Sequence, residues 1–101
     1  MLVPVLPMAS LGDGDSATCR VHGRDLLVVC AEGAYFAVDA LCSHAGQSLA
    51  SGRIKGREII CPLHGARFDL RTGACTKSPA SQPLTTYPVL LEAGKICIDM
   101  S

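Results

Sequence analysis

The sequence predicts an all-β fold with antiparallel sheets. Short strand-like runs recur along the chain, turn residues separate them, and no window has the periodicity of an amphipathic helix. Many short strands at such spacing are typical of antiparallel sandwiches and barrels. Because 101 residues suffice for one domain and no more, we expect residues 1–101 to form a single domain.

Each expected strand is bounded by residues that favour turns. Gly23, Glu32-Gly33 and Ala93-Gly94 mark turns between consecutive runs. In the last run, apolar residues at positions 96, 98 and 100 alternate with residues 95, 97 and 99, which predicts one buried face and one polar face. The expected strands cover residues 17–22, 26–30, 35–38, 58–60, 67–70, 84–91 and 95–99.

Composition excludes several classes of function. Nine Lys and Arg balance nine Asp and Glu, so the chain lacks the basic excess of a nucleic-acid binder. The longest apolar stretch, Met1–Leu11, contains Pro4 and Pro7, has no basic residue before it, and is far shorter than a membrane span. We therefore expect a cytoplasmic protein without membrane association, in which the six Cys stay reduced.

Two Cys/His pairs lie in a segment rich in small residues and glycine, residues 41–70, which we interpret as an insert. Cys42-x-His44 belongs to its first loop and Cys61-x-x-His64 to its second, and a hairpin that turns near Lys55-Gly56 joins the two. Glycines follow both pairs, and they allow backbone N–H groups to approach an anionic centre. Two thiolates and two imidazoles on paired loops predict a four-ligand metal site.

The ligand types leave two metals open. Tetrahedral zinc accepts two Cys and two His, but zinc loops commonly pair Cys with Cys and His with His. Here each loop supplies one Cys and one His, which favours a two-iron cluster with Cys on one iron and His on the other. Spacing alone favours the iron–sulfur site and leaves a zinc-binding interaction module as the alternative.

The ligand boxes Cys42-Ser43-His44 and Cys61-Pro62-Leu63-His64-Gly65 resemble those of Rieske proteins. The match extends through residues 68–73, Pro79-Ala80 and residues 87–89, so it covers most of the chain. The resemblance implies a Rieske-like β-sandwich base with a small cluster-binding subdomain at 41–70. It also implies one 2Fe–2S cluster, with Cys42 and Cys61 on the inner iron and His44 and His64 on the outer iron. Pro79 and Ala80 match the loop that covers the cluster in this family.

The chain departs from respiratory Rieske proteins at two pairs of positions. Gln47 and Leu63 stand where those proteins have two further Cys, so their disulfide cannot form here. Ala66 and Phe68 stand where those proteins have Ser and Tyr hydroxyls that donate hydrogen bonds to sulfur. Fewer donors stabilise the reduced cluster less, which predicts a midpoint potential at the low end of the Rieske range of roughly −150 to +300 mV.

The resemblance is strongest to Rieske-type ferredoxins of aromatic-ring hydroxylating dioxygenase systems. It implies a one-electron carrier between a flavin-containing, NADH-dependent ferredoxin reductase and a terminal oxygenase, which we expect to be monomeric. The chain is not expected to be an enzyme, because the mononuclear iron of an oxygenase needs two further His and only His22, in an expected exposed turn, remains. The alternatives are a carrier for another oxygenase and a nitrite reductase small subunit, although many such subunits lack the four ligands.

Two remaining features have structural and functional interpretations. Residues 53–77 contain six basic and two acidic residues, a balance of +4 that could form a docking collar around the cluster or a row of solvated strand faces. The four other cysteines share no ligand-like spacing, and we expect free thiols that pack as small residues. These are Cys19, Cys30, Cys75 and Cys97.

Overall fold

β-strands dominate the computed structural model, which describes residues 1–41, 48–62, 65–77 and 82–100. Within these residues η1 (Met8–Ser10) is the single helix, and no helix here is long and apolar enough to cross a membrane. The strands are β1 (Leu2–Pro7), β2 (Ser16–Val21), β3 (Arg24–Ala31), β4 (Ala34–Asp39), β5 (Arg53–Lys55), β6 (Glu58–Ile60), β7 (Arg67–Asp69), β8 (Cys75–Lys77), β9 (Thr86–Tyr87), β10 (Val89–Glu92) and β11 (Lys95–Asp99).

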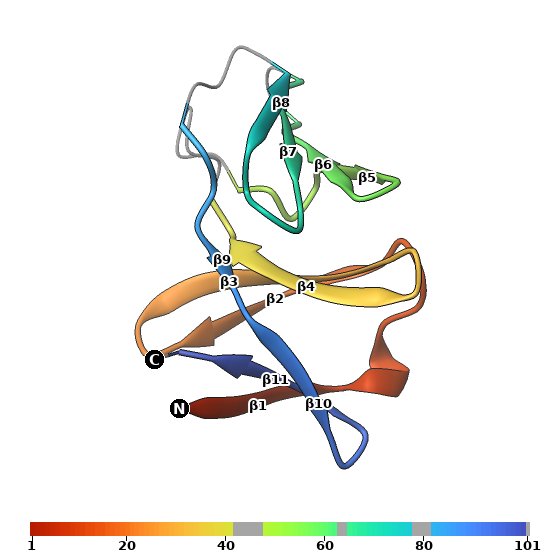
Figure 1. Cartoon of the computed structure of the whole chain (residues 1–101), viewed down its shortest axis with the longest axis vertical. Coiled ribbons are helices and arrows are strands. Elements are labelled where there is room, and N and C mark those ends of the chain that lie inside the picture. Colours follow the sequence, from red (N-terminus) through yellow and green to blue (C-terminus); the bar gives the residue numbers. More distant parts are fainter. Residues whose placement is uncertain (42–47, 63–64, 78–81, 101) are drawn as a thin grey trace.

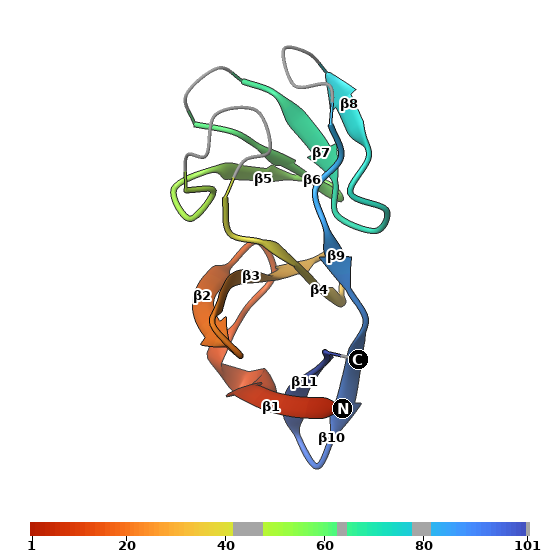
Figure 2. The same ribbon diagram turned by 90° about the vertical axis from the view of Figure 1, so that its left-hand side faces the viewer.

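The strands form three antiparallel sheets, which are stacked along the long axis of the molecule (Figure 1). Their strand orders are β1-β11-β10, β2-β3-β4-β9 and β5-β6-β7-β8. Figure 2, turned by a quarter, shows the same order, with the four-stranded sheet of β2, β3, β4 and β9 in the middle. The predicted all-β antiparallel architecture is confirmed: two sheets form a sandwich, and β5–β8 form a small third layer.

Three two-residue turns connect consecutive strands, at His22-Gly23, Glu32-Gly33 and Ala93-Gly94. In each turn both residues have positive φ, 50° and 79°, 51° and 78°, and 51° and 75° respectively. This is the backbone of a type I′ turn, whose twist matches that of paired strands. The predicted turns are confirmed, and His22 is exposed in the β2–β3 turn as expected.

Strand β3 is buried on both faces, and this connects the three layers. Leu26 and Val28 pack toward β1 and β11, in a core that includes Ile96 and Ile98. The alternate residues Leu27 and Val29 pack in a second core beneath the β5–β8 sheet. Side chains alternate along a strand, so a continuous apolar run is what a central strand between two layers requires.

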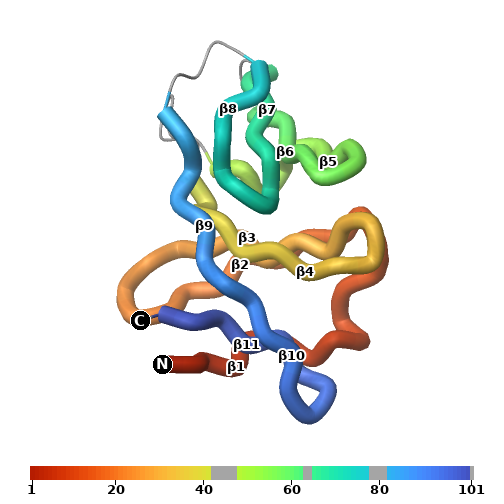
Figure 3. Tube along the Cα trace, viewed as in Figure 1, coloured from red at the N-terminus to blue at the C-terminus, as the bar shows by residue number. Residues whose placement is uncertain are grey.

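The run expected as one strand over 84–91 is divided between two sheets. β9 pairs with β4 in the middle sheet, whereas β10 pairs with β11 in the lower one, and Pro88 lies between them. The Pro88 nitrogen carries no hydrogen for a sheet ladder, while its carbonyl accepts from Asp99 N–H at 2.9 Å. The expectation of a single strand was therefore wrong at the proline, where the chain crosses between layers (Figure 3).

The lower sheet adds a strand that was not expected and corrects one expectation. The apolar N-terminal segment forms strand β1, although Pro4 lies within it; β1 is an edge strand, where a missing N–H is tolerated. Cys97 lies on the face expected to be polar, yet it is only 4% exposed. β11 lies between β1 and β10, and Ile96, Cys97 and Ile98 on it are all buried. The two chain ends meet across this sheet, with the Met1 amino group 3.3 Å from the Asp99 carboxylate.

Candidate metal centre

The structure describes Cys61, one of the four predicted ligands. Among the described residues, no three His, Cys, Asp or Glu side chains come together as a metal site. The described residues on either side of the other ligands show how their segments are anchored. The predicted site residues outside the described part of the chain are Cys42, His44, His64, Gln47, Leu63, Pro79 and Ala80.

The first ligand loop, residues 42–47, is closed at its base by backbone contacts. Leu41 and Ser48, the residues on its two sides, form an antiparallel bridge. The Leu49 N–H donates to the Ala40 carbonyl at 2.7 Å. The Leu49 side chain is fully buried beneath the β5–β8 sheet. The residues before and after the loop are therefore hydrogen-bonded to each other next to the end of β4.

The second ligand loop connects β6 to β7. Ile60 and Arg67 pair at its base, and just inside them the Cys61 N–H donates to the Ala66 carbonyl at 2.8 Å. The Gly65 N–H donates to the Cys61 carbonyl at 3.1 Å, and Gly65 has a φ of +75°. Cys61 itself is 1% exposed and belongs to the core beneath the β5–β8 sheet. The turn therefore begins at a buried cysteine, whose side chain belongs to this core.

The exit of the first loop packs directly against the entry of the second. The Gly52 N–H donates to the Leu49 carbonyl at 2.9 Å. A Cβ added to Gly52 would lie 2.6 Å from the Ile60 carbonyl oxygen and 3.0 Å from that of Leu49. Gly52 therefore allows a close backbone approach between the segment that follows residues 42–47 and the strand that leads into Cys61. The sequence shows a Ser-Gly turn here but not the neighbour that requires it.

A second close approach anchors the segment expected to cover the cluster. The Leu84 N–H, just beyond residues 78–81, donates to the Gly73 carbonyl at 2.8 Å. A Cβ on Gly73, whose φ is +78°, would lie 2.0 Å from the Leu84 carbonyl oxygen. Only glycine fits at this crossing, so the Thr72-Gly73 turn fixes where the covering segment returns to the middle sheet.

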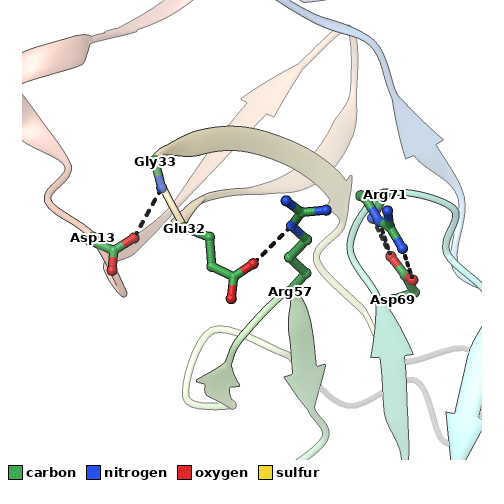
Figure 4. A network of polar contacts seen from close by, with 6 residues as sticks. All are labelled: Asp13, Glu32, Gly33, Arg57, Asp69 and Arg71. Carbon is green, nitrogen blue, oxygen red and sulfur yellow. Dashed lines mark hydrogen bonds and ion pairs between the residues drawn. The ribbon is translucent and has the colours of Figure 1, made fainter.

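An ion pair joins the middle sheet to the β5–β8 layer (Figure 4). The Arg57 Nε, in the β5–β6 turn, lies 2.8 Å from Glu32 Oε1 in the β3–β4 turn. The β3–β4 turn also contacts the segment between η1 and β2, because the Gly33 N–H donates to Asp13 Oδ1 at 3.4 Å. Both side chains of the ion pair are about half exposed, at 47% and 51%. Exposed ion pairs contribute little to the free energy of unfolding, so the main effect of this one is to orient the two turns.

Asp69 and Arg71 form a local pair in the turn after β7 (Figure 4). The Arg71 backbone N–H donates to Asp69 Oδ1 at 2.8 Å, and the Arg71 Nη2 lies 3.3 Å from Asp69 Oδ2. Hydrogen bonds from the Arg71 side chain and backbone hold the pKa of Asp69 below its usual value. Arg57 and Arg71 therefore have acidic partners within the protein, and they contribute less than expected to a basic collar.

The two positions that lack hydroxyl groups are both buried. Ala66 and Phe68 are 0% exposed and pack in the same core as Cys61. Phe68 pairs with Ile59 on β6 and with Cys75 on β8, so its ring contributes to the core of the small layer. Neither side chain can donate a hydrogen bond, in agreement with the residue types.

The cysteines outside the ligand boxes are structural. No disulfide joins the described cysteines, which include all four of them. Burial raises the pKa of the Cys19 and Cys30 thiols, which makes them poor nucleophiles. The Cys75 thiol donates to the Lys77 carbonyl at 3.3 Å. The interpretation of these residues as small packing groups agrees with this arrangement.

Comparisons with known proteins give one family. The model of the Rieske [2Fe-2S] domain matches residues 1–88. The chain is 36% identical over 99 residues to the ferredoxin component of the naphthalene 1,2-dioxygenase system of Pseudomonas aeruginosa, which covers 98% of this chain and 95% of that protein. The Sphingomonas yanoikuyae B1 ferredoxin superposes with a TM-score of 0.93 at 35% identity, covering 100% of both chains. A chain in the complex of reduced oxygenase and oxidized ferredoxin in carbazole 1,9a-dioxygenase superposes with a TM-score of 0.90 at 28% identity, covering 96% of this chain and 100% of that one.

The residues present fit the cluster that defines this family. Cys61, one of the expected ligands, is buried and is followed by Gly65 with a positive φ, and two Cys with two His are the ligands of a Rieske centre. Among the described residues, no atom lies within 4 Å of a Cβ added at Gly65. The chain belongs to the Rieske [2Fe-2S] family, in which it is a Rieske-type ferredoxin with one 2Fe–2S cluster.

Proposed function

We propose that this chain carries single electrons from a flavin-containing, NADH-dependent ferredoxin reductase to the terminal oxygenase of an aromatic-ring hydroxylating dioxygenase system. The observation that carries the proposal is 36% identity, over 98% of the chain, to a protein named as the ferredoxin component of such a system. The similarity to a ferredoxin seen in complex with its oxygenase supports the same direction of transfer. We assign the protein to the cytoplasm, as a monomer.

The ligand assignment follows from the two boxes. Cys42 and Cys61 hold the inner iron, and His44 and His64 hold the outer iron. The burial of Cys61 at the edge of the core supports an inner position for the sulfur ligands. When bound, the cluster supplies a one-electron redox centre. The protein's part is to hold the ligands on two loops whose bases are closed by backbone hydrogen bonds, so that little rearrangement accompanies a change of one charge.

The segment 41–70 is the cluster-binding insert of a single domain over 1–101. Its support is the packing between the loop exit at Gly52 and the loop entry at Ile60. The chain itself does not catalyse oxygenation. A mononuclear iron site needs two His and a carboxylate, and His22 is the one histidine not assigned to the cluster. It lies exposed in the β2–β3 turn.

Histidine variants test the ligand assignment, and His22 offers a matched control. We expect His44→Ala and His64→Ala to lose the visible absorption and the EPR signal of the reduced cluster, and most of the bound iron. His22→Ala should keep all three at the level of the unchanged protein. A His64→Ala protein with full iron and an unchanged spectrum would contradict the assignment.

Reconstitution tests the carrier function. The purified holoprotein is combined with NADH, a flavin-containing ferredoxin reductase, and the terminal oxygenase of the naphthalene or the carbazole system. We expect substoichiometric amounts of this chain to couple NADH oxidation to substrate hydroxylation, with little product in its absence. If neither oxygenase re-oxidises the reduced chain, the proposed direction of transfer is wrong.

A further inference from the structure

A row of basic residues crosses the β5–β8 sheet. Arg53 on β5 pairs with Ile60 on β6, Ile60 pairs with Arg67 on β7, and Arg67 pairs with Lys77 on β8. Three cations and one isoleucine thus occupy a single line of cross-strand neighbours. We refer to Arg53, Arg67 and Lys77 as the basic row. They are separated by up to 24 positions in the sequence, and only the strand register aligns them.

The basic row faces away from the core. On the adjacent line, Ile59 pairs with Phe68, and both side chains are fully buried between the layers. Because successive side chains of a strand point to opposite faces, Ile60 and Arg67 point outward. Arg53 and Lys77, at the two ends of the line, are exposed.

The basic row borders the second ligand loop. Ile60 directly precedes Cys61, and Arg67 directly follows Ala66, so the row is the last line of the sheet before the turn that begins at Cys61. The acidic residues of this sheet, Glu58 and Asp69, pair with each other two lines farther from the loop, beyond the Ile59–Phe68 pair. Positive charge is therefore concentrated on the side of the sheet nearest the proposed cluster.

The cations of the basic row are poorly neutralised within the described residues. No carboxylate of these residues lies within ion-pair distance of Arg53 or Lys77. The Arg67 Nη1 is 3.8 Å from Glu58 Oε1, and the buried Arg67 Nε has no hydrogen-bond acceptor there. Like charges at directly opposed positions, such as Arg67 and Lys77, destabilise a sheet. An external anion would relieve this repulsion.

A groove at this place is large enough to admit an acidic side chain. It has a volume of about 350 Å³, and its lining combines basic and apolar side chains: Arg53, Ile54, Lys55, Ile60 and Arg67. The guanidinium groups of arginine match a carboxylate in shape, and aliphatic side chains around them lower the local dielectric constant. The groove therefore suits a carboxylate on a short side chain.

We propose that the basic row and this groove form the docking surface for an acidic patch on the ferredoxin reductase, one carboxylate of which enters the groove between Arg53 and Arg67. The inference rests on the proposed carrier function and adds the chemistry of the partner surface. Arg57 and Arg71, which bind Glu32 and Asp69 internally, take no part. Opposite charges across the contact steer the encounter and place the partner beside the cluster loop.

Two small oxidants of opposite charge test the basic row without a protein partner. Reduced holoprotein is mixed in a stopped-flow instrument with ferricyanide, which carries three negative charges, or with tris(phenanthroline)cobalt(III), which carries three positive charges. Each takes one electron from the reduced cluster. We expect Arg53→Gln/Lys77→Gln to lower the ferricyanide rate constant about five- to twentyfold at low ionic strength and to raise the cobalt rate constant. High salt should remove both effects.

Lys95→Gln is the matched control, because Lys95 is an exposed lysine in the β10–β11 hairpin of the lowest sheet. Lys77→Gln should change the two rate constants in opposite directions, by about threefold each, while Lys95→Gln leaves them unchanged. Equal effects of Lys77→Gln and Lys95→Gln would overturn the proposal. So would Arg53→Gln/Lys77→Gln changes of the same sign for both oxidants.

The partner is tested with a reductase that reduces the unchanged chain. We expect Arg53→Gln/Lys77→Gln to raise the KM for this chain about tenfold, with kcat retained, and the difference to vanish at high salt. A KM equal to that of Lys95→Gln would overturn the docking surface and leave the carrier function intact. If no reductase reduces the unchanged chain, the carrier function fails, and the two oxidants alone decide whether the basic row acts on electron exchange.

Discussion

Gly73→Ala should destabilise the protein far more than Gly94→Ala, although both glycines have similar left-handed backbones. Their φ values are +78° and +75°, so alanine at either site incurs the same conformational cost of about 1 kcal/mol. At Gly94 a Cβ meets nothing within 4 Å. At Gly73 it would lie 2.0 Å from the Leu84 carbonyl oxygen, so the backbone has to separate.

Separation at Gly73 has two further costs. It lengthens or breaks the 2.8 Å hydrogen bond from Leu84 N–H to the Gly73 carbonyl, which contributes about 1 kcal/mol. It also withdraws part of the Leu84 side chain, now 4% exposed, from the core, at about 1 kcal/mol. The free energy of unfolding should therefore fall by about 3 kcal/mol for Gly73→Ala, against about 1 kcal/mol for Gly94→Ala.

The assay is thermal unfolding of the holoprotein, followed at one scan rate by circular dichroism and by the visible absorption of the cluster. For a domain of this size, 1 kcal/mol corresponds to about 4–8 °C in Tm. We expect Gly94→Ala to lower Tm by about 4–8 °C and Gly73→Ala by about 12–24 °C, with earlier loss of the visible absorption in Gly73→Ala. Equal Tm values for the two variants would refute the reasoning from the close approach.

Three further predictions follow from the ligand loops and their supports. The midpoint potential should lie below about +100 mV, because Ala66 and Phe68 donate no hydrogen bond to sulfur, and redox titration by EPR measures it. Asp69→Asn should destabilise the protein at pH 7 by about 1 kcal/mol. The pKa of Asp69 is lowered in the folded state. The contribution of Asp69 to stability is therefore complete above the unfolded pKa and is lost as the pH falls through the folded pKa. The two proteins should therefore converge in urea midpoint in acid, and a constant difference down to pH 2 would contradict the pair with Arg71. Removal of iron should accelerate amide exchange in residues 42–66 more than in β3, because the glycine-rich segment has little apolar surface of its own; full protection there without iron would refute this.

Local sequence signals determined many of the strands and turns. Pairs such as Glu32-Gly33 and Ala93-Gly94 select type I′ turns through the conformation of two residues alone, and the continuous apolar run at 26–30 requires a strand with neighbours on both faces. The two Cys/His boxes are equally local signals, and the Rieske family that they resemble is confirmed by the match over residues 1–88. Signals of this kind involve residues a few positions apart.

Contacts between distant segments were not readable in the same way. The strand expected over 84–91 failed at Pro88 because nothing local shows that β9 and β10 join different sheets. Strand β1 was missed because Pro4 argues against a strand unless the strand lies at an edge. Cys97 was placed on a polar face because alternation does not reveal that β11 is central to its sheet.

The sequence by itself determined that this protein is an all-β chain of the Rieske [2Fe-2S] family, because those properties depend on residue identity and short spacing. Only the tertiary structure decided which basic residues of 53–77 share a surface. Arg57 and Arg71 bind Glu32 and Asp69 at turns of the chain, whereas Arg53, Arg67 and Lys77 align across the β5–β8 sheet on the line next to Cys61. The physical reason is strand register: a shift of one residue would move each of these side chains to the opposite face of the sheet.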